Sequence, residues 1–133
     1  MNSINENQIT PARIMEVGMG FWASKTLLTA VKMGVFTHLG KGGLSGKEIQ
    51  DKLKLHDRSL YDFLDTLVAL GFLQRSGLKE SAIYSNSEDS NLFLDKNKPS
   101  YMGGILELSN SRLYPFWNNL EEALITGNPQ YEA

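Results

Sequence analysis

Few residues of this 133-residue sequence carry side chains that commonly perform catalysis or bind metals. There are two histidines, His38 and His56, and no cysteine. Neither histidine has a second metal ligand at helical spacing, and the lack of cysteine excludes thiolate zinc sites, disulfides and cysteine nucleophiles. No serine stands in the strained turn that exposes a hydrolase nucleophile. We therefore expect no catalytic residue and no metal site, with both histidines in structural roles.

The segment Ile14–Ala23 comes closest to a cofactor-binding motif. Its sequence, IMEVGMGFWA, has an apolar pair, an acid and spaced glycines. It thereby resembles the glycine-rich first motif of S-adenosylmethionine-binding Rossmann domains, which needs a strand, a tight turn and a helix that approaches the ligand closely. Here Phe21 and Trp22 are bulky where the backbone must be bare, and no alternating series of strands and helices follows. We expect a helix whose glycines permit close packing, and no cofactor-binding residue.

Composition and charge indicate one ordinary globular domain. The sequence is 41% hydrophobic and 21% charged, and its formal net charge is −2. Such a chain can bury a core and has no general attraction to nucleic acid or anionic membranes. Its most apolar stretch, residues 14–36, is interrupted by charges, and its first ten residues lack the basic segment of a signal peptide. We expect a cytoplasmic protein with a flexible tail over residues 1–10 and one domain over residues 11–133.

The N-terminal half of the sequence predicts helices from periodicity and capping signals. Apolar residues recur at helical spacing from Pro11, with Thr10 as the cap, to about Met33. A capping box follows, in which Ser45 is the cap and Glu48 stands three residues later. We expect the short helix that this box opens to end near residue 53.

A winged-helix unit is predicted in the middle of the chain. We expect Asp57 to cap a helix that Gly71 ends. Two short strands around a polar turn then predict one small β-hairpin within about residues 72–86. Three helices followed by a hairpin have the order of a winged helix. The three helices are expected over residues 27–39, 46–53 and 58–70.

Further helices are expected after the hairpin. A short helix covers residues 87–94, and a longer one opens at Pro99 or Ser100. An amphipathic helix follows over about residues 113–126, with Pro115 in its first turn or at a kink. The predicted fold class is therefore mainly α, a winged-helix-like domain with additional N- and C-terminal helices for dimerisation.

The first helix and the last two helices carry more apolar surface than a domain of this size can cover. A helix that is apolar around most of its circumference must be covered on most of it. Exposed apolar patches of this extent are uncommon on monomers, so we expect a homodimer. The candidates for its interface are Met15, Met19, Phe21, Trp22, Tyr114, Phe116 and Trp117.

A winged helix also raises the alternative of a DNA-binding transcription regulator. Its third helix would have to present basic and amide groups to a DNA groove. Here Arg58 stands among Asp57, Asp62 and Asp65, and the hairpin adds only Arg75 and Lys79. This charge pattern suits duplex DNA poorly, so protein contact is favoured and no nucleic-acid partner is expected.

Several short segments occur along the chain in a characteristic order. They are GFWASK (20–25), AVKMGVF (30–36), LSGKEI (44–49), LVALGFL (67–73), YSN (84–86), PSYMGG (99–104) and LYPFW (113–117). Together they resemble the N-terminal dimerisation domain of small-molecule O-methyltransferases of the caffeate, hydroxyindole and bacterial polyketide types, which depend on S-adenosylmethionine. The resemblance implies a dimerisation and acceptor-pocket module for a small aromatic or polyketide-like hydroxyl substrate.

In that family a Rossmann domain with its own glycine-rich loop and a histidine base follows this segment. The sequence ends at Ala133 without either feature. We therefore expect the chain alone to be inactive and to bind no cofactor, with the methyltransferase domain present in cis or as a separate chain. The sequence could be a fragment, a truncated reading frame or a separate subunit.

The resemblance also implies positions in the acceptor pocket. Carried over by position, Leu108, Leu113 and Trp117 would line its wall, while Met19 and Phe21 would come from the other chain. Flat acceptors suit apolar pockets with aromatic faces and an adaptable thioether. The alternative is that all five residues only fill the core of the dimer.

Overall fold

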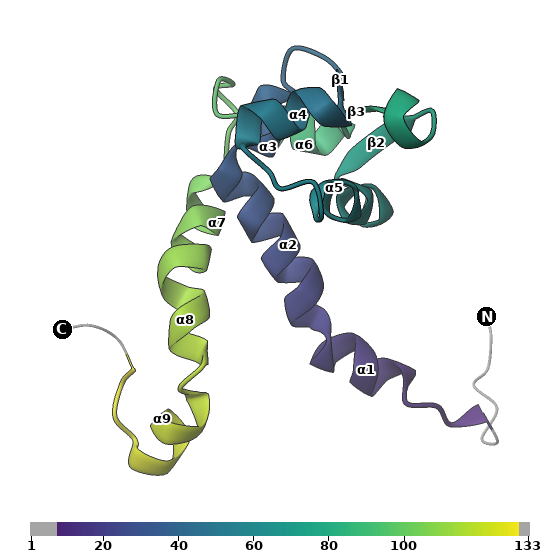
Figure 1. Ribbon diagram of the computed structural model, residues 1–133. Helices are drawn as coiled ribbons and strands as arrows, with labels where there is room; N and C mark the ends of the chain where they lie inside the picture. Colours follow the sequence, from purple (N-terminus) through teal and green to yellow (C-terminus); the bar gives the residue numbers. More distant parts are fainter. Residues whose placement is uncertain (1–7, 131–133) are drawn as a thin grey trace.

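Two helical arms diverge from a folded head in the computed structural model of this chain, which describes residues 8–130 (Figure 1). One arm leads from the N-terminus into the head, and the other leads away from the head toward the C-terminus. The first arm contains α1 (Ala12–Gly18) and α2 (Gly20–Met33), and the second contains α7 (Gly104–Leu108), a π-helical segment (Ser109–Leu113), α8 (Tyr114–Trp117) and α9 (Leu120–Thr126).

The head has the predicted winged-helix architecture. Strands β2 and β3 form the expected hairpin, and a short strand that the sequence analysis did not predict, β1, pairs with β3. The three antiparallel strands have the order β1-β3-β2. The predicted mainly α fold with a small hairpin is confirmed. In chain order, the head contains α3 (Val35–His38), β1 (Leu44–Ser45), α4 (Gly46–Leu53), α5 (Leu60–Ala69), β2 (Leu73–Ser76), a 3₁₀ turn (Lys79–Ser81), β3 (Ile83–Asn86) and α6 (Glu88–Phe93).

The hydrophobic core lies in the head. Phe36, Leu64 and Leu67 are fully buried there, together with Tyr84 of the central strand and Val31 near the end of α2. By contrast, α1, α7, α8 and α9 contain no buried residue. The arms therefore have no core of their own.

The carboxylate of Asp65 on α5 forms hydrogen bonds with two residues of the hairpin. Asp65 accepts hydrogen bonds from Arg75 Nη1 at 2.9 Å and from the Tyr84 hydroxyl at 2.8 Å. Burial of the ring and the bond to Asp65 raise the pKa of Tyr84 to about 12. Tyr84 therefore stays a neutral donor at physiological pH, and its bond to Asp65 joins α5 to the hairpin.

The predicted helix from Pro11 to Met33 is confirmed as helical, but it is broken at one residue. Met19, between Gly18 and Gly20, has φ −97° and ψ 6° and separates α1 from α2. Glycine is a poor helix former, so two glycines around one residue favour such a break. A Cβ atom added at either glycine would meet nothing within 4 Å, so the expected close packing is not seen within one chain.

The capping box is confirmed. The Glu48 N–H donates to Ser45 Oγ at 3.2 Å, and the Ser45 N–H donates to Glu48 Oε1 at 3.0 Å. These bonds lower the pKa of Glu48. The predicted cap at Asp57 is wrong, because α5 begins after Ser59 and Asp57 instead accepts a hydrogen bond from Gln50 of α4.

The C-terminal arm begins later than predicted and is not one continuous helix. Residues 99–103 are not helical, and α7 begins only at Gly104, so the helix start predicted at Pro99 or Ser100 is wrong. Farther along, Pro115 lies in the first turn of α8 and cannot donate the backbone hydrogen bond that an α-helix would direct to Ser111. The π-helical segment, whose turn is wider than that of an α-helix, lies directly before α8. Gly127, with φ 74°, ends α9 as expected.

Replacing Ser45 with alanine should lower the free energy of unfolding by about 1 kcal/mol, because the first turn of α4 loses its capping oxygen. Ser59→Ala is the matched control, since Ser59 precedes α5 without a side-chain capping bond. Urea denaturation followed by circular dichroism measures both variants. Equal losses in the two would contradict the role assigned to Ser45.

Candidate functional site

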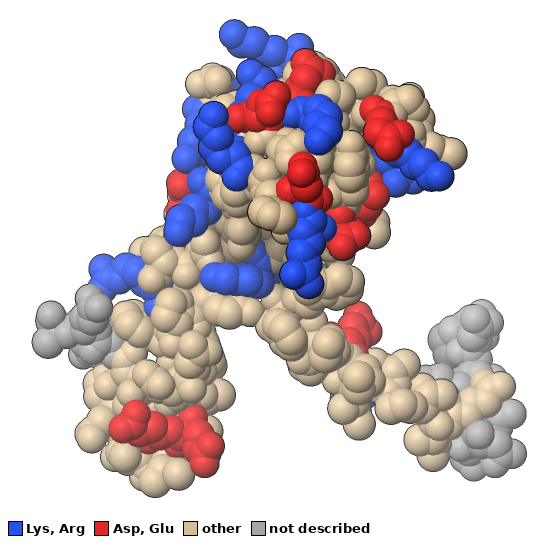
Figure 2. Space-filling model, viewed as in Figure 1, with Lys and Arg blue, Asp and Glu red and all other residues tan. Residues whose placement is uncertain are grey.

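Large apolar side chains are concentrated on the two arms. Val17 is 79% exposed, Trp22 59% and Trp117 67%, although residues of these types are normally buried. Figure 2 shows that charged residues crowd the head, whereas the arms are mostly uncharged, with a few scattered charges and an acidic patch on α9. That patch consists of Glu121 and Glu122. Large exposed apolar surfaces mark interaction sites on soluble proteins.

The residues predicted for a dimer interface lie on these surfaces. Five of them are exposed, and Tyr114 and Phe116 on α8 are half-buried. The exposed members are Met15, Met19, Phe21, Trp22 and Trp117.

The predicted acceptor-pocket residues are divided between the arms. Leu108, Leu113 and Trp117 are exposed on the C-terminal arm, while Met19 and Phe21 are exposed where α1 meets α2. Within one chain the arms meet near these positions, because the Tyr114 hydroxyl donates a 3.3 Å hydrogen bond to the Phe21 carbonyl.

A polar cluster that the sequence analysis missed joins the two arms. The ammonium group of Lys25 on α2 donates a hydrogen bond to Asn110 Oδ1 in the π-helical segment. The same nitrogen lies 4.8 Å from the centroid of the Tyr114 ring, a cation–π contact. Asn110 is one of the few buried polar residues of the chain. In the sequence, the only indication of this cluster is that Asn110 interrupts a helical pattern of apolar residues.

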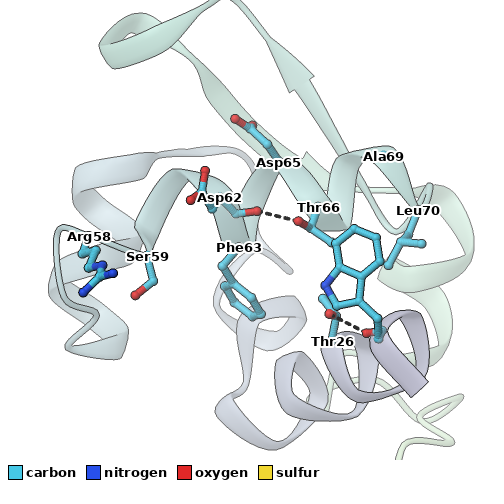
Figure 3. Close-up of a pocket in the computed structure, with 10 residues that line it drawn as sticks. Thr26, Arg58, Ser59, Asp62, Phe63, Asp65, Thr66, Ala69 and Leu70 are labelled. Carbon is cyan, nitrogen blue, oxygen red and sulfur yellow. Dashed lines mark hydrogen bonds between the residues drawn. The ribbon is translucent and has the colours of Figure 1, made fainter. Parts of the chain in front are cut away.

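The described residues contain a groove between α2 and α5 of about 780 Å³ (Figure 3). Apolar atoms of Trp22, Phe63 and Leu70 line it, and the charged side chains of Arg58 and Asp62 stand on the α5 side. Smaller side chains complete the lining: Thr26, Ser59, Thr66 and Ala69, together with the carboxylate of Asp65. None of the five predicted acceptor residues lines this groove.

The charges of α5 and the hairpin are mixed rather than basic. Asp62 and Asp65 stand along α5 with Arg58 just before it, and Arg75 of the hairpin is already paired with Asp65. This surface offers little positive charge to a phosphate backbone.

Within residues 8–130, no group of three or more histidine, aspartate or glutamate side chains is placed to hold a metal ion. The helices described there are also too short or too polar for any of them to cross a lipid bilayer.

Comparisons with known proteins agree on one family. A family model described as the O-methyltransferase dimerisation domain matches residues 15–96. The tetracenomycin polyketide synthesis 8-O-methyl transferase TcmO of Streptomyces glaucescens is 40% identical over 120 residues, which are 90% of this chain and 34% of that protein. Acetylserotonin O-methyltransferase of Gallus gallus is 33% identical over 124 residues, which are 92% of this chain and 36% of that protein.

A solved structure has the same fold. Human N-acetylserotonin methyltransferase in complex with SAM superposes with a TM-score of 0.83 at 23% identity, over 94% of this chain and 37% of that one. The chain thus spans about a third of the length of the curated relatives that it matches.

Lys25→Met should lower the free energy of unfolding by about 1–3 kcal/mol, because the buried acceptor of Asn110 loses its donor. Lys32→Met is the matched control on the same helix, where the exposed Lys32 forms no ion pair within residues 8–130. Urea denaturation of both variants measures the difference. Indistinguishable midpoints would show that Lys25 does not hold the arms together.

Proposed function

The chain belongs to the family of O-methyltransferase dimerisation domains, and on that premise we propose that it is the dimerisation and acceptor-pocket module of an S-adenosylmethionine-dependent O-methyltransferase. The observation that carries the proposal is the pair of apolar arms outside the core of the head. The proposed substrate class is a small aromatic or polyketide-like compound with a hydroxyl group. We also propose a cytoplasmic location, which suits a chain without cysteine.

A second copy of the chain is the proposed partner of the arms. Helix α1 has seven residues, none of them buried, and a helix of this length is not stable alone in water. In a symmetric dimer one exposed patch covers another of the same kind, so both arms could be buried at once. Obligate interfaces of this sort bury about 2,000 Å² or more and resemble a divided core.

The acceptor pocket is proposed where the arms of two copies meet. Leu108, Leu113 and Trp117 would form its wall, and Met19 and Phe21 would reach it from the other copy. Exposure of all five in a single chain supports the proposal, since each has surface available to a ligand or a partner. The bond between Lys25 and Asn110 would hold the wall at a fixed angle to α2.

The methyl donor would be bound by a part of the protein other than this chain. S-adenosylmethionine would supply the methyl group there. Gly18 is the last residue of α1 and Gly20 the first of α2, with no strand before them within the described residues, which is not the strand and turn that a cofactor loop needs. The residues of this chain would bind and orient the acceptor and exclude water from it.

The alternative of a DNA-binding regulator has no support. The relatives matched are methyltransferases, and the third helix of the winged unit presents Asp62 and Asp65 beside a single arginine.

Sedimentation velocity should give the chain a mass near twice 14.9 kDa at micromolar concentration. Trp117→Asp should shift it toward the monomer, because a charge would be placed in the interface. Leu78→Asp on the hairpin is the matched control, since Leu78 is 68% exposed and Trp117 67%. A wild-type monomer, or equal effects of the two substitutions, would refute the proposed dimer surface.

A fusion of this chain to the remaining part of the Streptomyces glaucescens relative tests the pocket. Met19→Ala should raise KM for the hydroxyl acceptor, because the thioether would contact it, and should leave KM for S-adenosylmethionine and the dimer unchanged. Met15→Ala is the control, because Met15 is similarly exposed on α1. Loss of dimer with unchanged acceptor kinetics in the remaining dimer would mean that Met19 only fills the interface.

A further inference from the structure

We propose that the groove between α2 and α5 of one copy receives helix α1 of a second copy. This inference rests on the proposed homodimer and names one contact within it. The groove and the helix belong to the same chain sequence, so a symmetric dimer would form the contact twice.

Helix α1 needs a partner that its own chain does not supply. Ile14 is 67% exposed, Met15 54% and Val17 79%, so more than half of the surface of each of these residues is left uncovered. Seven residues give a helix about 10 Å long, which cannot persist on backbone hydrogen bonds alone. A contact with the surface of a second copy would therefore stabilise α1.

The groove has the size and chemistry for such a helix. Its lining residues on α5 extend from Asp62 to Ala69, a stretch that spans about 11 Å of helix and so is comparable in length to α1. Trp22, Phe63 and Leu70 offer apolar surface along it. Trp22 is 59% exposed in the single chain, so most of its indole is free to pack against the incoming helix.

Charge complementarity selects α1 and sets its direction. Arg13 and Glu16 lie about one turn apart on α1, and Arg58 and Asp62 are four residues apart beside the groove. None of these four side chains forms an ion pair within residues 8–130. If α1 runs antiparallel to α5, Arg13 faces Asp62 while Glu16 faces Arg58. Such exposed pairs add little affinity but fix orientation.

Helix α9, which likewise has no buried residue, fits the groove less well. Helix α9 carries Glu121 and Glu122 and has no basic residue. In the groove it would place two acids near Asp62 and Asp65. Like charges at an interface disfavour a partner, so α1 is the better occupant.

The lack of cysteine allows a direct test with engineered disulfides. In the antiparallel arrangement Val17 lies near Ser59, which is exposed and lines the groove. A chain with Val17→Cys and a differently tagged chain with Ser59→Cys are co-expressed and then oxidised. We expect a disulfide-linked heterodimer on a non-reducing gel. Two cysteines on separate chains can form it only if α1 of one copy reaches the groove of the other.

Two control pairs make the result specific. Ser59→Cys is combined with Leu124→Cys on α9, and Val17→Cys with Lys52→Cys, an exposed position on α4. Neither pair should cross-link above background. A strong Ser59–Leu124 product would assign the groove to α9, and cross-linking of all pairs alike would indicate random collision. Either result would overturn the inference.

Charge reversal provides a second measurement. Arg13→Glu and Asp62→Arg should each raise the dimer dissociation constant about fivefold, and the double variant should restore it. If the chain sediments as a dimer without the Val17–Ser59 link, this inference fails and the proposed dimer stands. If the chain sediments as a monomer, the proposed dimer fails as well.

Discussion

The hydrogen bond from Lys25 to Asn110 is the interaction on which the arrangement of the two arms depends. The hydrophobic core ends at the head, and Leu106 is the last residue of the C-terminal arm that packs against it. Beyond that point Lys25 holds Asn110 and lies over the Tyr114 ring, and Tyr114 reaches the Phe21 carbonyl. A polar contact of this kind has strict geometry, whereas apolar surfaces alone would let the arms slide.

The backbone of the C-terminal arm is adapted to this contact. Because Pro115 has no N–H, the regular helical ladder is interrupted one turn before it, and the π-helical segment that carries Asn110 occupies this stretch. Such turns are frequent at functional sites. Along the chain, Leu108 precedes Asn110 and Leu113 follows it. In the proposed enzyme, the contact that fixes the arms would therefore also fix the acceptor wall, so dimer geometry and acceptor binding would be coupled through Lys25.

The features that sequence could predict are those set by a few neighbouring residues. The capping box at Ser45 needs only the residue three positions away, and Gly71 and Gly127 end helices through their own positive φ. The cap at Asp57 failed because a residue of another helix, Gln50, binds that carboxylate. The short strand β1 exists only through its pairing with β3, and the groove exists only because α5 lies beside α2. Neither leaves a periodic signal. The exposed arms were predictable, since an excess of apolar residues is visible in composition and spacing.

A winged helix can serve protein contact instead of DNA binding through a small number of charges. The helix that would enter a DNA groove carries Asp62 and Asp65. Asp65 forms an ion pair with Arg75 and so neutralises one positive charge of the hairpin. What remains beside α5 is an apolar groove with one cation and one free carboxylate on its edge. Mixed charges next to apolar surface favour a protein partner over a polyanion, because both signs can be paired by another chain. The same three helices and hairpin thus acquire a different function from their surface chemistry, while the core that holds them is unchanged.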